Sequence, residues 1–218
     1  MNAIKNLLAA AAFTVAAGAA SAAGLDIRFE QTTGIALTTS DSSDYLSGAM
    51  HYVDNSGRSF EAFCIELAQG HATTAAGFQS YTAGSFTGTQ ASLLQGLFSS
   101  SYAGVGTAVE KAAFQTAIWE ITHEQSGVLD ANAGSFSFYW LREDSTAEED
   151  AAFLSLTSTY LQAAQSYTGA PQYVLTKLAS PQFQDLVTVS AVPEPETYAM
   201  LLAGLGVIGF VARRRQRG

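Results

Sequence analysis

Two side chains in this 218-residue chain have the clearest potential for chemistry: its single cysteine, Cys64, and the amide of Gln115. A lone cysteine cannot form a disulfide within its own chain. Three interpretations of it therefore remain: an inert buried thiol, an intermolecular disulfide, or a sulfur engaged in other chemistry. Composition alone favours the inert thiol. Gln115 needs a hydrogen-bonding partner, because a buried unsatisfied amide costs about 1–3 kcal/mol.

Other ionisable side chains lack the spacing that a reactive site requires. Glu66, Glu120 and Glu124 could pair as acid and base for sugar hydrolysis, but acidic residues are abundant here and chance pairing is the default. His51 and His71 are isolated, with no second ligand at metal spacing, so we expect neither a metal nor a cofactor. The sequence contains no Gly-x-Ser-x-Gly elbow and no phosphate-binding loop.

The elements around Cys64 are predicted to be antiparallel strands. Residues 45–53 and 59–67 have strand character and are separated by a turn at 54–57, which indicates a hairpin. Side chains alternate along a strand, so Cys64 faces away from the bulky apolar set, which consists of Phe63, Ile65 and Leu67.

Gln115 lies on a predicted helix that begins with a capping box at 107–110 and runs to Gly127. Helices are also expected at 89–100 and from Ser145 to before Gly169, and strands at 136–141 and 186–190. One stripe of the central helix combines small, aromatic and polar residues, namely Ala108, Ala112, Gln115, Trp119 and Thr122. These patterns predict an α+β fold with an antiparallel, barrel-like sheet and a small helical subdomain.

Two motifs on these elements resemble the thioester domain, also called the TQxA domain, of bacterial surface adhesins. The first is an aromatic-Cys-hydrophobic motif on the strand of Cys64. The second is a hydrophobic-Gln-x-Ala-Ile-Trp motif within the central helix, and it begins at Phe114. The resemblance matches Cys64 to the family's thioester cysteine and Gln115 to its glutamine. The family's threonine before the glutamine is Phe114 here, and the 51-residue spacing implies a compact version.

The resemblance implies an internal thioester, formed when the Cys64 thiolate adds to the Gln115 carboxamide and expels ammonia. A surface amine or sugar hydroxyl would attack this acyl carbon and free the thiol, so the expected role is single-turnover covalent bonding and not enzymatic catalysis. His123, two turns after Gln115, is a candidate base, although a histidine late in a helix is more often a solvated cap. Apolar walls would protect the bond from water, and the candidates are Phe63, Phe114, Ile118 and Trp119.

Residues 1–23 are typical of a secretory signal peptide. Lys5 precedes an apolar run at 7–20, and small residues then allow signal peptidase to cut after Ala22 or Ala23. A retained membrane helix is disfavoured, because the run is shorter than the ~20 residues that a bilayer requires. We therefore expect an exported mature protein.

The other end, 192–218, has three consecutive parts. A short motif at 192–195 precedes a mostly apolar span at 198–212, and an arginine-rich end follows at 213–217. Arginines after an apolar span resist translocation, so a membrane-anchored intermediate with a cytoplasmic C-terminus is expected. The motif is Val192, Pro193, Glu194 and Pro195, and the stop-transfer residues are Arg213, Arg214 and Arg215.

This tail resembles the PEP-CTERM sorting signal. The resemblance implies recognition by exosortase, a membrane transpeptidase of bacteria that make exopolysaccharide, with cleavage near the motif and loss of the transmembrane-like span. The mature protein would then reach the envelope, the outer surface or the extracellular matrix. The tail says nothing about what the domain binds.

Residues 24–190 have the length of one domain. Residues 24–192 contain 17 Asp and Glu and 5 Lys and Arg, which gives a net charge of −12. This negative charge excludes nucleic acid as a partner. The membrane is expected to be contacted only through the tail. The leading hypothesis is an adhesin-like domain that bonds to an extracellular amine or hydroxyl. The alternatives are a non-covalent module for exopolysaccharide or ice, and an extracellular carboxylate-dependent hydrolase.

Overall fold

The computed structural model describes residues 24–40, 45–142, 144–192, 203–205 and 208. The predicted signal peptide lies outside the described residues, as do positions 193–195 of the sorting motif, the stop-transfer arginines and most of the apolar span. Within the described part of the chain, no helix combines the length and the apolar character needed to cross a membrane.

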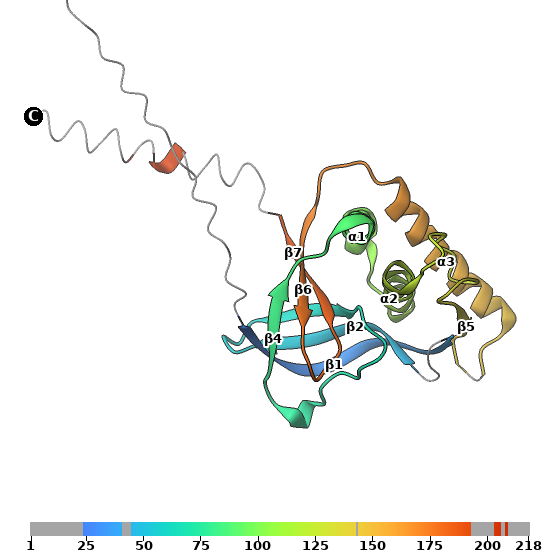
Figure 1. The fold of residues 1–218 in the computed structure, drawn as a ribbon, viewed down its shortest axis with the longest axis horizontal. Helices are drawn as coiled ribbons and strands as arrows, with labels where there is room; N and C mark the ends of the chain where they lie inside the picture. Colours follow the sequence, from blue (N-terminus) through green and yellow to red (C-terminus); the bar gives the residue numbers. More distant parts are fainter. Residues whose placement is uncertain (1–23, 41–44, 143, 193–202, 206–207, 209–218) are drawn as a thin grey trace, which may run out of the picture.

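Seven antiparallel strands form one strongly curved sheet. Its order is β2-β3-β7-β6-β4-β1-β5, and β1 also pairs with β2, so six strands close into a barrel and β5 extends one end of β1. In Figure 1, β4, β6 and β7 cross β1 and β2 steeply. The strands are β1 (Gly24–Thr39), β2 (Tyr45–Asp54), β3 (Ser59–Cys64), β4 (Gln79–Gly84), β5 (Phe138–Trp140), β6 (Tyr173–Ala179) and β7 (Leu186–Ala191).

Three helices pack together beside this barrel (Figure 1): α1 (Gly88–Ser101), α2 (Ala108–His123) and α3 (Ala147–Ser166). Short 3₁₀ turns lie at Thr74–Ala76 and Tyr102–Gly104. Helix α2 contacts β1, β2 and β3 on one side and α1 and α3 on the other. The predicted α+β class with a barrel-like sheet and a helical part is confirmed.

Helix α2 is buried on every side. All ten residues from 112 to 121 are buried, because the barrel covers one face and α1 and α3 cover the rest. A stripe facing the core was expected from the sequence, but a helix enclosed by neighbours needs no solvent-facing side. Gln115 therefore lies in the interior, at 1% exposure.

Several predicted boundaries differ from the structure. Helix α2 ends at His123 and not at Gly127, because Glu124 adopts an extended conformation. Helix α3 is capped by Thr146, one residue after the predicted Ser145, with Glu149 completing the capping box. The strand expected at 136–141 is shorter, the strand of Cys64 ends at Cys64 itself, and β4 and β6 were not predicted.

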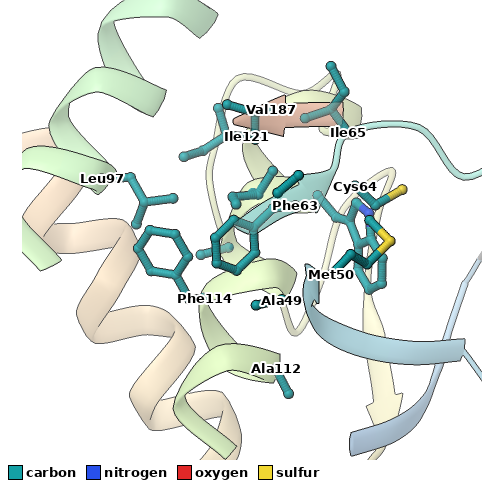
Figure 2. Close-up of a cluster of buried hydrophobic side chains, with 14 of the residues drawn as sticks. Ala49, Met50, Phe63, Cys64, Ile65, Leu97, Ala112, Phe114, Ile121 and Val187 are labelled. Atoms are coloured by element: carbon teal, nitrogen blue, oxygen red, sulfur yellow. The ribbon is translucent and has the colours of Figure 1, made fainter. Parts of the chain in front are cut away.

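The main apolar core lies between the barrel and the helices. Phe63 of β3 packs against Phe114 of α2, with ring centroids 5.2 Å apart, and Phe98 of α1 contacts both rings. In Figure 2, Phe63 points towards the helices, whereas Cys64 points the other way, beside Met50. The alternation of β3 thus places the aromatic core and the sulfur on opposite faces.

Candidate functional site

The strand pairing fixes the backbone of Cys64. The residue ends β3 and pairs with Leu186 of β7, and its side chain is only 3% exposed. The next amide, of Ile65, donates to the Asp185 carbonyl at 3.0 Å. The thiol therefore projects from a backbone that is held by its pairing with β7.

Gln115 reaches Cys64 through two hydrogen bonds. The Cys64 N–H donates to Gln115 Oε1 at 2.8 Å, and Gln115 Nε2 donates to the Cys64 carbonyl at 2.7 Å. Ser47 of β2 helps to set the depth of the helix, since its hydroxyl donates to the Ala112 carbonyl at 3.0 Å. The sequence did not show which group would pair with the Gln115 amide. The structure shows that the backbone of Cys64 does so.

The sulfur contacts a second glutamine. Cys64 Sγ lies 2.6 Å from the Glu66 carbonyl and 3.1 Å from Gln184 Oε1, two acceptors between which the single thiol proton must choose. Gln184 is 2% exposed, and its Nε2 lies 2.9 Å from Met50 Sδ. Gln184 was not singled out from the sequence, because it lies in the loop before β7, where no periodic pattern marks a buried side chain.

Burial keeps the thiol protonated. It raises the pKa of Cys64 to about 12, and hydrogen bonding with the Glu66 backbone and the Trp119 side chain counters this only in part. Tyr45, which packs edge-on against Trp119 at 5.1 Å, has its pKa raised to about 12, mainly by burial. Both groups are therefore neutral over the physiological pH range.

Cys64 and Gln115 open on one cavity of about 370 Å³. Trp119 and Gln184 also line it, and no Asp, Glu, Lys or Arg is among the lining residues. The lining consists of Thr32, Tyr45, Leu46, Gly48, Met50, Cys64, Gly70, His71, Gln115, Trp119 and Gln184.

The other predicted site residues are divided between this cavity and the core. Trp119 lines the cavity, whereas Phe63, Phe114 and Ile118 are fully buried and are absent from its lining. His123 occupies the last turn of α2 and does not line the cavity, but His71, set aside in the sequence, does.

The three carboxylates considered for hydrolysis do not line this cavity. Glu120 accepts the Asp130 N–H at 2.7 Å, and Glu124 accepts the Ser135 N–H at 2.7 Å, so each organises the loop after α2. Among the described residues, no group of three or more His, Cys, Asp or Glu side chains is arranged to hold a metal ion.

Comparison with known families and structures identifies the tail and the fold. A family model for the PEP-CTERM protein-sorting motif matches residues 191–215. The N-terminal thioester domain of fibronectin-binding protein SfbI from Streptococcus pyogenes has 10% sequence identity and a TM-score of 0.50, over 78% of this chain and 94% of that one. The fold is therefore that of a thioester domain, and the chain ends in a PEP-CTERM sorting motif.

Two further structures are similar. The N-terminal domain of the Streptococcus pyogenes pilus tip adhesin Cpa has 13% identity and a TM-score of 0.47, over 77% of this chain and 94% of that one. The N-terminal thioester domain of a Clostridium perfringens surface protein has 14% identity and a TM-score of 0.44, over 78% and 100% of the two chains. No curated protein sequence matches the chain.

Proposed function

We propose that this protein is an exported, adhesin-like module that forms an internal Cys64–Gln115 thioester and bonds covalently to an extracellular nucleophile. The observation that carries the proposal is the pair of hydrogen bonds that hold the Gln115 amide against the Cys64 backbone, where both residues open on one cavity. The role is single-turnover attachment.

Formation of the bond is balanced by the loss of ammonia. The Cys64 sulfur adds to the Gln115 amide carbon, the C–N bond breaks, and the thiol proton leaves with the nitrogen as ammonia. The Cys64 N–H donates to the Gln115 oxygen at 2.8 Å and can stabilise the negative charge that develops there. The product would lie at buried residues, Cys64 and Gln115, which limits its access to water.

Gln115 is favoured over Gln184 as the acyl partner. The Gln115 oxygen accepts a backbone N–H that can stabilise an oxyanion, whereas Gln184 Oε1 accepts from the thiol itself at 3.1 Å. Its contact instead holds the sulfur inside the cavity. We assign Gln184 a positioning role.

The two ends of the chain supply export and sorting. Signal peptidase would remove residues 1–23, and exosortase would process the PEP-CTERM tail and release the domain to the envelope, the surface or an exopolysaccharide matrix. The membrane would be contacted only through the tail, before processing. The TM-score of 0.50 to a domain from a fibronectin-binding protein is consistent with an adhesive role.

Intact mass of the purified protein tests the thioester. The wild type should be lighter than its sequence mass by one ammonia, should resist thiol reagents, and should take up methylamine at residue 115 as a thiol appears. Cys64→Ala and Gln115→Ala should each abolish the mass loss. Gln162→Ala, at an exposed position of α3, is the matched control and should retain it.

Three results would contradict the proposal. A full-mass wild type with a reactive thiol would exclude the thioester and favour the non-covalent binding module. Methylamine attached to residue 184 would assign the acyl group to the other glutamine. Target attachment that survives both Cys64→Ala and Gln115→Ala would separate adhesion from this site.

A further inference from the structure

His71 lies on the cavity that contains Cys64 and Gln115, but the proposed thioester formation does not use it. We propose that His71 is the general base for acyl transfer and that the acceptor it serves is a neutral hydroxyl group, such as that of a sugar or polyol. This inference rests on the proposed thioester, because it concerns the second half of the same reaction.

The surroundings of His71 fix which ring nitrogen is basic. Nδ1 lies 2.8 Å from the Ala72 carbonyl, which can only accept, so Nδ1 carries the proton. In the neutral ring, Nε2 then has the lone pair, and no hydrogen bond from the described residues occupies it. The ring packs on Phe29 at a centroid distance of 4.2 Å, which restricts its orientation.

The loop that carries His71 is tied to the site. The Gln184 N–H donates to the Gly70 carbonyl at 3.2 Å, immediately before the histidine, and the Gln184 side chain contacts Cys64 Sγ at 3.1 Å. Gly70 and His71 both line the cavity. His71 is itself exposed, so it lies where an acceptor enters from solvent.

The other ionisable groups leave the histidine as the proton acceptor. Cys64 and Tyr45 share the cavity, and the pKa of each is raised to about 12, so both stay protonated near neutral pH. Glu66 and Asp185 lie close enough to raise the Cys64 pKa, yet neither lines the cavity. Histidine is the residue that most readily exchanges a proton near neutral pH.

The same lining indicates the class of acceptor. A lysine amine is protonated at neutral pH and would have to enter as a cation, but the lining offers no carboxylate to pair with it. A hydroxyl group enters without charge. It is a poor nucleophile until a base takes its proton, and His71 meets that requirement.

The transfer step balances without another reactant. The hydroxyl proton passes to His71 Nε2 as its oxygen bonds to the acyl carbon of residue 115. The carbon–sulfur bond then breaks, and the Cys64 thiolate takes the proton back from His71. The products are an ester at residue 115 and a free Cys64 thiol.

A comparison of two nucleophiles shows whether His71 acts as a general base or only supports the structure. Glycerol represents the hydroxyl class and needs a base, whereas hydroxylamine is uncharged above neutral pH and attacks without one. In the purified full protein, His71→Gln should still lose ammonia and react with hydroxylamine within about twofold of the wild type. Its transfer to glycerol should fall about 100-fold or more, the usual contribution of general-base catalysis.

The pH profile gives a second measurement. Transfer to glycerol in the wild type should rise with pH and then level off, and His71→Gln should lose that dependence on pH. His123→Gln, which changes a histidine outside the cavity lining, should keep the wild-type profile.

The outcomes distinguish the two proposals. A wild type that never loses ammonia refutes the thioester and this inference together. A loaded wild type in which His71→Gln keeps the glycerol rate and profile, or slows both nucleophiles equally, overturns the role of His71 alone. A loaded wild type that reacts with hydroxylamine and methylamine but not with glycerol overturns the hydroxyl acceptor.

Discussion

At the scale of single residues, two buried amides, those of Gln115 and Gln184, lie beside the Cys64 sulfur. Gln115 is satisfied by the Cys64 backbone, and Gln184 is shared between Cys64 and Met50. Buried amides of this kind impose geometry, because misplacing either one leaves polar atoms without partners. The sulfur is held in place by hydrogen bonds as well as by apolar packing.

Glu120 gives a residue-scale prediction about pH. Burial raises its pKa from 4.5 to about 7; the hydrogen bond from the Asp130 N–H opposes this shift in part, and the charges of Glu124 and Asp130 add to it. The fold favours the protonated form, so this residue should make the protein progressively less stable as pH rises from about 4.5 to about 7. Glu120→Gln should flatten that part of the pH–stability curve measured by urea unfolding.

The comparison should be made between the two proteins at each pH, so that other carboxyl groups cancel. Glu124, whose pKa is lowered to about 2 mainly by a hydrogen bond from the Ser126 backbone, affects stability only at more acidic pH. Parallel curves for the wild type and Glu120→Gln between pH 4.5 and 7 would show that the carboxyl is not held in its neutral form.

The pairing of Cys64 with Gln115 could be predicted from two motifs, but their neighbours could not. Neither motif contains His71 or Gln184, which reach the cavity from two adjacent loops, one after β3 and one between β6 and β7. Loop residues carry no periodicity, and their positions depend on pairings between distant strands. His123 was considered as a possible base, and discounted as a solvated cap, because helical spacing was the only geometry that the sequence provided.

At the scale of elements, the close crossing of α1 and α3 depends on one small residue. Gly96 of α1 has no room for a side chain, because an added Cβ would lie 2.3 Å from the Ala164 carbonyl of α3. The two helices together cover the side of α2 that faces away from the barrel. The distance between α1 and α3 therefore affects the packing around α2, the helix that carries Gln115.

Gly96→Ala should force α1 and α3 apart and destabilise the fold by about 1–3 kcal/mol, the usual cost of overpacking. Thermal unfolding followed by circular dichroism measures this effect. Gly104→Ala is the matched control, since nothing lies within 4 Å of the added Cβ there. Equal stability of the two variants would contradict a tight crossing at Gly96.

Helix starts were more predictable than strands. The Thr107–Glu110 capping box is present as expected, with Glu110 N–H donating to Thr107 Oγ1 at 3.2 Å. At α3, two hydroxyl residues stand in succession and each precedes a glutamate by three, so the sequence alone did not decide between Ser145 and Thr146. Strands β4 and β6 lack a clear apolar alternation, and partners distant in sequence stabilise them.

At the scale of the whole molecule, the last strand leads directly into the sorting signal. Strand β7 ends at Ala191, the residue at which the PEP-CTERM match begins, so the described structure has no separate linker between them. The acidic domain is thus followed closely in the sequence by the arginine-rich end at 213–217. Processing of the tail should leave the barrel complete.

Substitutions in the sorting motif test whether the tail is processed independently of the barrel. Pro193→Ala combined with Pro195→Ala should leave the tail uncut, because the proposed transpeptidase would no longer recognise its motif. The protein should then accumulate in the membrane fraction at the mass of the tailed form, with ammonia still lost at Cys64 and Gln115. Normal release of this variant would refute exosortase processing at these residues.

The position of the tail also determines how the domain would carry mechanical load. Cys64 pairs with Leu186 at one end of β7, and the chain leaves the barrel at Ala191, the other end. Tension between a target anchored in the cavity and a cell attached at the tail would pull β7 lengthwise between β3 and β6. The hydrogen bonds on both edges of that strand would then resist together in shear, so the barrel is oriented to withstand traction.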